Sequence, residues 1–173
     1  EEEEHAMPPM RLPHEEEQES DEDEPALLRY KVNVLVTRSK TAGAPVVHET
    51  HPTISNIIGR IEHRVRSGET ITDFTRIRGG ALYRANGGYL ILEAQDLLRE
   101  PNAWEGLKRA LKNRQVELDD PGEPGRMLNI VSLRPEPVSL TVKVCLIGTP
   151  ELFYFLTSGD PDFGKLFKVK ADF

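Results

Sequence analysis

Two polar side chains stand directly after apolar runs, and both are of types that can handle a phosphate group. Glu93 follows the run of residues 89–92, and Thr149 follows the run of residues 140–147 and Gly148. A carboxylate can coordinate a magnesium ion, and a hydroxyl can hydrogen-bond a phosphate oxygen. Each residue could instead cap the helix that follows it. The residue types therefore indicate either a phosphate site or two helix caps.

The two apolar runs are the elements that must position these side chains. Residues 89–92 and 140–147 are apolar over a strand's length, which is typical of strands buried on both faces of a parallel sheet. Ligands bind beyond the carboxyl ends of the strands in an open parallel sheet. Such a sheet would therefore place Glu93 and Thr149 on neighbouring loops.

Periodicity and turn residues predict the remaining elements. Strands that alternate with helices indicate an α/β fold, in which helices flank a parallel sheet and a β-hairpin is inserted. The predicted elements are a strand over 30–37, a loop over 39–52, a helix over 54–65 capped by Thr53, a strand over 89–92, a helix from Pro101, a hairpin of 115–118 with 129–133, a strand over 140–147 and a helix over 151–156.

Charge is distributed unevenly along the 173 residues, whose net charge is −7. Of the 29 acidic and 22 basic residues, 12 acids and one base, Arg11, lie in residues 1–24, which leaves residues 25–173 with about +4. A segment with dense like charge and few apolar residues cannot bury enough surface to fold. We therefore expect residues 1–26 to be a disordered acidic linker and residues 27–173 to form one domain.

Composition also excludes several classes of protein. No apolar run approaches the roughly 20 residues that span a bilayer, and no signal peptide is visible. The single cysteine, Cys145, allows no internal disulfide, which is consistent with the cytoplasm, and its apolar strand predicts a buried, inert thiol. Because the chain lacks an initiator methionine and ends at Phe173 without a helix cap, we expect it to be a piece of a longer protein.

Two sets of side chains have competing interpretations. Three histidines could bind zinc, but the lack of nearby cysteines favours exposed loop histidines: His48, His51 and His63. Trp104 is interpreted as a core or docking anchor. Six arginines could attract nucleic acid or an acidic partner: Arg60, Arg64, Arg66, Arg76, Arg78 and Arg84.

Several blocks, in the right order, resemble Lon-related proteases with a diverged AAA+ module. Residues 86–94, Asn-Gly-Gly-Tyr-Leu-Ile-Leu-Glu-Ala, resemble the Walker B region, and residues 142–149 resemble the sensor-1 strand. The resemblance covers about residues 27–173. The other matching blocks are residues 43–47, 59–64, 72–75, 80–88 and 166–173.

The resemblance implies roles for particular residues. Glu93 takes the position of the magnesium-coordinating acid, Thr149 takes the sensor-1 position, and Ala94 stands where the family has the acid that polarises water. The cations nearest to the expected arginine finger are Lys165 and Lys168. The pore loop that contacts substrate falls at Ile57, Ile58 and Gly59.

The chain lacks a G-x-x-x-x-G-K-S/T phosphate loop and a Ser-Lys proteolytic dyad. We therefore expect no catalytic residue and no bound cofactor in this chain alone. The resemblance implies that the longer protein uses ATP and magnesium, forms a hexameric cytoplasmic ring and delivers unfolded proteins to a proteolytic chamber. The arginines would then line a subunit interface or pore, and no membrane or nucleic-acid partner is expected.

Three alternatives remain. Ala94 supports a degenerate, ATP-independent module of the same family. The Asn-Gly-Gly strand also occurs in the AAA+ modules of enhancer-binding transcription activators, but the Gly-Ala-Phe-Thr-Gly-Ala loop of that family is absent between Arg60 and Phe74. A third alternative is an interaction module in which the arginines pair with the acidic tail of a neighbouring subunit.

Overall fold

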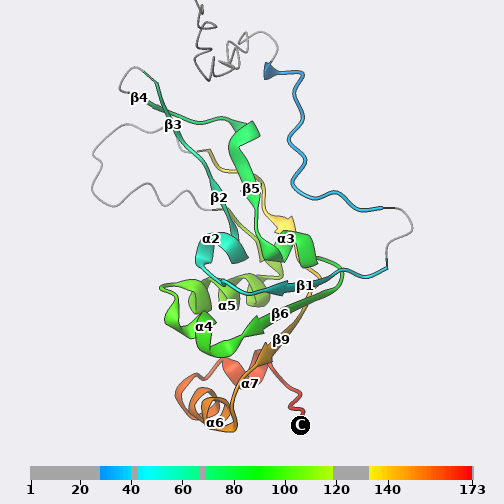
Figure 1. Ribbon diagram of the computed structural model, residues 1–173, viewed down its shortest axis with the longest axis vertical. Coiled ribbons are helices and arrows are strands. Elements are labelled where there is room, and N and C mark those ends of the chain that lie inside the picture. Colours follow the sequence, from blue (N-terminus) through cyan, green and yellow to red (C-terminus); the bar gives the residue numbers. More distant parts are fainter. Residues whose placement is uncertain (1–27, 40–42, 67–68, 119–132, 173) are drawn as a thin grey trace, which may run out of the picture. The chain divides into compact units, whose positions relative to one another are not determined.

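The computed structural model describes residues 28–39, 43–66, 69–118 and 133–172 (Figure 1). The chain divides into two compact units, residues 1–32 and residues 33–173. In the first unit, the Lys31 N–H donates to the Leu28 carbonyl at 3.1 Å and forms a single turn. The predicted disordered linker, residues 1–26, lies outside the described residues. The second unit holds all the described strands and the helices from α2 to α7.

A three-stranded parallel sheet forms the centre of this unit (Figure 1). Its strands are β1 (Val46–Glu49), β6 (Tyr89–Glu93) and β9 (Lys143–Ile147), with β6 in the middle. Helix α3 (Ala81–Ala85) packs on β1 and β6, and α4 (Ala94–Arg99) packs on β6. The prediction of an α/β fold with a parallel sheet flanked by helices is therefore confirmed.

The two faces of the sheet differ in burial. Leu90 and Leu92 of β6 are fully buried, whereas Tyr89 is 40% exposed. The pairing register places Cys145 beside Ile91 on the more open face, where Cys145 is exposed. The predictions of strands buried on both faces and of a buried thiol were wrong, because the described helices cover one face of the sheet better than the other.

The first strand lies where a loop was predicted. β1 begins directly after Pro45, whose carbonyl accepts a hydrogen bond from the Tyr89 N–H at 2.8 Å. Glycine and proline around this short strand led to its interpretation as loop. Its strand pairing comes from β6, far along the chain, which local composition does not encode.

Residues 31–39 form no strand, although their alternation predicted one over 30–37. Val34 is 65% exposed, while Leu35 and Val36 pack against the core. The segment is held instead by the Asn33 side-chain amide, which donates to the Phe74 carbonyl at 2.8 Å and the Ile77 carbonyl at 2.9 Å.

The helix predicted over 54–65 is a single turn, α2 (Ile54–Ile57). Thr53 is its N-cap as predicted, and the Thr53 hydroxyl accepts from the Asn56 N–H at 3.1 Å. The helix ends because Gly59 has a φ of +116° and a Cβ there would lie 2.4 Å from the Arg78 carbonyl oxygen. Gly59 turns the chain into a strand instead.

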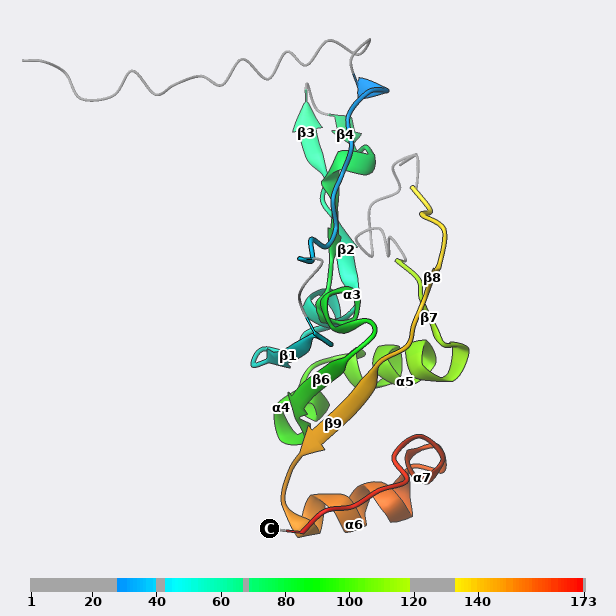
Figure 2. The same ribbon diagram turned by 90° about the vertical axis from the view of Figure 1, so that its right-hand side faces the viewer.

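Two nested antiparallel pairs follow and build a narrow arm (Figure 2). The inner pair joins β2 (Gly59–Ile61) to β5 (Ile77–Gly79), and the outer pair joins β3 (Arg64–Arg66) to β4 (Glu69–Ile71). A 3-10 turn, η1 (Phe74–Arg76), precedes β5. The apolar residues that had suggested a helix therefore belong to this arm and to α2.

A third antiparallel pair lies between the end of α5 and the start of the last strand. α5 (Ala103–Asn113) matches the helix predicted from Pro101, although it starts two residues later. β7 (Gln115–Val116) pairs with β8 (Val138–Ser139). Residues 129–132 of the predicted partner, 129–133, lie outside the described residues, and Leu133 is not in a strand.

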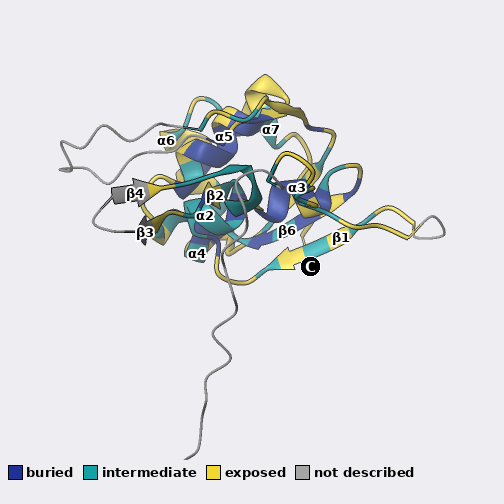
Figure 3. Cartoon of the chain, turned by 90° about the horizontal axis from the view of Figure 1, so that it is seen from above, coloured by how far each residue is buried: buried dark blue, intermediate teal, exposed yellow. Residues whose placement is uncertain are grey.

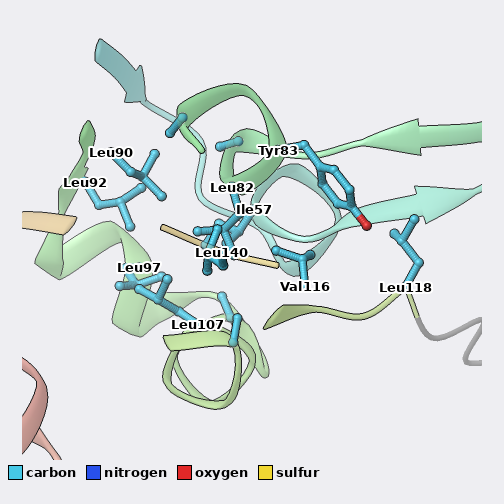
Figure 4. Packing of buried hydrophobic residues seen from close by; sticks show 14 of the residues in the cluster. Ile57, Leu82, Tyr83, Leu90, Leu92, Leu97, Leu107, Val116, Leu118 and Leu140 are labelled. Atoms are coloured by element: carbon cyan, nitrogen blue, oxygen red, sulfur yellow. The ribbon is translucent and has the colours of Figure 1, made fainter. Parts of the chain in front are cut away.

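The core lies between the sheet, α2, α3, α4 and α5. Figure 3 shows buried residues on α3, α5 and β6, and Figure 4 shows how their side chains meet. The fully buried large side chains are Ile57, Leu82, Leu90, Leu92, Leu97, Leu107 and Val116. No helix in the described ranges is both long and apolar enough to span a lipid bilayer.

The last two helices, α6 (Pro150–Gly159) and α7 (Phe163–Leu166), contact α5 through a polar cluster at Asp160, an ion pair between Lys112 and Asp162, and aromatic rings. Asp160 Oδ2 accepts from the Trp104 indole at 2.8 Å and from Lys108 Nζ at 2.7 Å. Trp104 also stacks on Phe167, with ring centroids 5.9 Å apart. Trp104 is thus an anchor between helices.

Candidate functional site

A pocket of about 620 Å³ lies beyond the carboxyl ends of β6 and β9. The parallel register pairs Glu93 with Ile147, so the residues that follow these two positions emerge side by side. Glu93 and Thr149 both line the pocket, together with groups that the sequence did not single out. Its lining is Glu93, Gln95, Ile147, Gly148, Thr149, Glu151, Leu152 and Phe155.

Glu93 and Thr149 differ in what their side chains contact. The Thr149 hydroxyl oxygen caps α6 by accepting from the Leu152 N–H at 3.4 Å. Glu93 occupies the N-cap position of α4 but makes no side-chain capping bond there. Thr149 is therefore a helix cap, as one interpretation predicted, whereas the Glu93 carboxylate caps no helix and is available to the pocket.

A second carboxylate, Glu151, belongs to the α6 end of the pocket. Its own backbone N–H and then the Thr149 hydroxyl donate to it, and together they lower the pKa of Glu151 below its ordinary value. Glu151 is negatively charged at neutral pH.

The pocket carries negative charge and no compensating cation. Glu93 and Glu151 are its charged groups, and within the described residues no lysine or arginine lines it. Free phosphate would be repelled, whereas carboxylate and amide oxygens are ligands that magnesium prefers. No cluster of three histidine, cysteine or acidic side chains in the described ranges could hold a metal alone. The residues present thus fit a magnesium ion that brings other ligands, such as phosphate and water.

Ala94 is the first residue of α4 and lies between two pocket-lining residues, Glu93 and Gln95. It is only 4% exposed and does not line the cavity. Its Cβ lies 3.4 Å from the position that a Cβ on Gly148 would occupy. Ala94 therefore packs between the two strand ends, where small side chains allow them to approach.

The two lysines named from the sequence lie outside this pocket. Lys165 pairs with Asp162 at 3.5 Å, and its side chain is 75% exposed. Lys168 follows α7 and is exposed. Neither lysine is brought to Glu93 within this chain.

The residues named as a substrate-contacting loop lie against the core. Ile57 is fully buried in α2, and Ile58 packs on the same core while half-buried. Gly59 is half-buried at the start of the β2–β5 arm. In this structure the Ile57 side chain is not available to a substrate.

Four of the six arginines, all within the described residues, form ion pairs with nearby carboxylates, and one of them, Arg76, lies 4.0 Å from Asp73. Arg60 and Arg78 contact Glu62 at 2.8 and 3.0 Å, and Arg84 contacts Glu49 at 2.7 Å. The hydrogen bond from Arg78, assisted by that from Arg60, lowers the pKa of Glu62 below its ordinary value. The exposed histidines, His48, His51 and His63, do not form a metal cluster within the described residues.

A parallel sheet with helices packed on it and a pocket beyond adjacent strand ends is the arrangement of an open α/β domain that binds a ligand at the carboxyl edge of its sheet. The chain belongs to the family described as LonB-like, AAA domain, whose model matches residues 42–173. The Lon-related AAA+ character predicted from the sequence is therefore confirmed.

The chain is less similar to curated proteins and to solved structures. No curated protein matches the chain. A crystal structure of NtrX from Brucella abortus is similar at 20% identity with a TM-score of 0.44, over 73% of this chain and 26% of that one. The chain therefore spans about a quarter of the length of that protein.

Sequence reasoning missed Gln95 and Glu151 as pocket residues. Each lies two residues beyond a strand end or helix cap that the sequence had identified, Glu93 and Thr149. Residues immediately after a strand in a parallel sheet share the ligand-binding edge. Extending the search by two positions would have found both.

Proposed function

We propose that this chain is part of the AAA+ module of a Lon-like, ATP-dependent serine protease. The longer protein would be a cytoplasmic hexameric ring that selects unfolded proteins and feeds them to a proteolytic chamber. One observation carries the proposal: Glu93 and Thr149 line a single pocket at the ends of neighbouring parallel strands. Membership of the LonB-like AAA family supports it.

In this proposal Glu93 holds the magnesium ion that accompanies ATP, directly or through water. The ion neutralises phosphate charge, which an acidic pocket cannot do by itself. A phosphate-binding loop would come from a part of the longer protein outside this chain. Thr149 would couple the pocket to α6, because its hydroxyl both lines the pocket and caps that helix.

In the proposed ring, the exposed lysines would contact a neighbouring subunit and the residues after Ile57 would contact substrate. Lys165 and Lys168 lie away from the pocket of their own chain, so they would approach the nucleotide of a neighbouring subunit. Because Ile57 is buried, contact with a threaded substrate would fall to Ile58 and Gly59, at the base of the arm.

A second candidate is a degenerate module in an ATP-independent member of the family. The buried Ala94 favours it, because a methyl group cannot polarise water. The two candidates predict opposite results when ATP turnover of the longer protein is measured.

We expect Glu93→Ala to lower ATP turnover of the longer protein by about tenfold or more, because the variant loses a magnesium ligand. Degradation of an unfolded substrate such as casein should fall in parallel. Glu117→Ala is the matched control, since Glu117 is an exposed glutamate outside the pocket. A wild-type protein that degrades casein at the same rate with and without ATP would support the degenerate module instead.

A further inference from the structure

Gln95 is the polar residue that the fold presents to the pocket next to Glu93. β6 ends at Glu93, and Gln95 is the second residue of α4. Glu93 and Gln95 line the pocket, while Ala94 between them is 4% exposed and does not line it. Ala94 also has no polar group to offer, whereas Gln95 has a side-chain amide.

The Gln95 side-chain amide is also uncommitted. It is exposed to the pocket and makes no side-chain hydrogen bond within the described part of the chain. The other neutral polar side chain there, the Thr149 hydroxyl, accepts a hydrogen bond from the Leu152 N–H at 3.4 Å and caps α6. If Glu93 binds magnesium, the exposed Gln95 amide is the polar group of the pocket that can hydrogen-bond a water molecule.

We propose that Gln95 positions the water that attacks the γ-phosphate of ATP, an inference that rests on the proposed function. A carboxamide can accept a hydrogen bond from water through its oxygen and donate one to a phosphate oxygen through its nitrogen, which aligns the two reactants. An amide is too weak a base to take the proton itself. Gln95 is thus a positioning residue.

The reaction that it serves is hydrolysis by in-line displacement. A lone pair of the water oxygen forms the new bond to the γ-phosphorus. The bond from that phosphorus to the β,γ-bridging oxygen breaks, and its electron pair leaves with ADP. The proton lost by the water ends on the inorganic phosphate or in solvent, so no additional reactant is required.

The test compares Gln95→Ala, Gln95→Glu and the control Gln115→Ala in the longer protein. Gln115 is an exposed glutamine on β7, outside the pocket. We expect Gln95→Ala to lower kcat for ATP about a hundredfold while KM and the Kd for Mg·ATP change less than twofold. Gln95→Glu should restore turnover, since a carboxylate can orient and polarise the same water. Gln115→Ala should behave as wild type.

A second readout separates water positioning from a structural role. Mg·ADP with aluminium fluoride mimics the transition state, so wild type should trap it and Gln95→Ala should not, although both bind Mg·ATP. A Gln95→Ala protein with wild-type kcat, or one that loses Mg·ATP binding, would overturn the inference alone. A wild-type protein that neither binds nor hydrolyses Mg·ATP would overturn the proposed function, and the inference with it.

Discussion

Gly88→Ala is expected to prevent the chain from reaching its folded state in useful yield. A Cβ on Gly88 would lie 2.0 Å from the Pro45 carbonyl oxygen and 2.7 Å from the Pro45 ring. Neither strand can move aside, because the Tyr89 N–H donates to that same Pro45 carbonyl and the Lys143 N–H donates to the Gly88 carbonyl. The clash therefore occurs where backbone hydrogen bonds join β6 to both β1 and β9.

Overpacking of a well-packed site costs about 1–3 kcal/mol and sometimes more, and a backbone clash of this kind belongs to the upper end. We expect a loss of at least about 3 kcal/mol in the free energy of unfolding, or insoluble protein. The measurement is urea unfolding of the 173-residue chain, followed by fluorescence of its single tryptophan, Trp104.

The matched control is Gly159→Ala at the end of α6, where a Cβ would meet no atom within 4 Å. Alanine is favoured over glycine in a helix, so this variant should keep or gain stability by up to about 1 kcal/mol. Equal urea midpoints of unfolding for Gly88→Ala and Gly159→Ala would contradict the close approach of Pro45 to Gly88.

Asp160→Asn is expected to lower the free energy of unfolding by about 3 kcal/mol. The carboxylate is nearly buried and accepts hydrogen bonds from Lys108 and Trp104, while the Lys108 side chain is only 9% exposed. Loss of one partner of a buried ion pair leaves the other charge poorly compensated. Glu105, 2.7 Å from Lys108, limits the damage. Asp172→Asn is the control, because Asp172 is 72% exposed and its pair with Lys170 contributes little.

The same carboxylate should make stability depend on acid. Burial alone would raise the pKa of Asp160, but hydrogen bonds from Lys108, the Asp162 N–H and Trp104 outweigh burial and lower the pKa from 3.8 to about 2. Because the folded pKa is depressed, the stabilisation is complete above about pH 4 and is lost as the pH falls through 2. The stability gap between wild type and Asp160→Asn should therefore narrow between pH 5 and pH 2. A gap that stayed constant over this range would contradict the assignment.

The elements that sequence reasoning located correctly are those whose local signal matches their final environment. β6, β9 and α5 form where apolar runs or helical spacing predicted them, and β6 and α5 contribute buried residues to the core. Their order placed Glu93 and Thr149 at one edge of a sheet, and both line one pocket. The local pattern was sufficient to locate these elements, although it did not predict that β9 has no fully buried residue.

The errors arise where distant contacts decide the structure. The isoleucines after Thr53 have helical spacing, but Gly59 faces the Arg78 carbonyl and the chain turns into the β2–β5 arm. The alternation at residues 30–37 has no partner strand among the described residues, and Asn33 bonds the arm instead. In the pocket, the engagement of the Thr149 hydroxyl and the burial of Ala94 depend on how α6 and β9 meet. Spacing along one chain does not encode that geometry.

The most direct test of the proposed function is the magnesium dependence of nucleotide affinity at the ends of β6 and β9. The Kd of the longer protein for a fluorescent ATP analogue would be measured with magnesium and with EDTA, for wild type and Glu93→Ala. We predict that magnesium tightens binding by about tenfold or more in wild type and has almost no effect in Glu93→Ala. Equal affinities under all four conditions, or no binding at all, would contradict a magnesium–nucleotide site at this pocket.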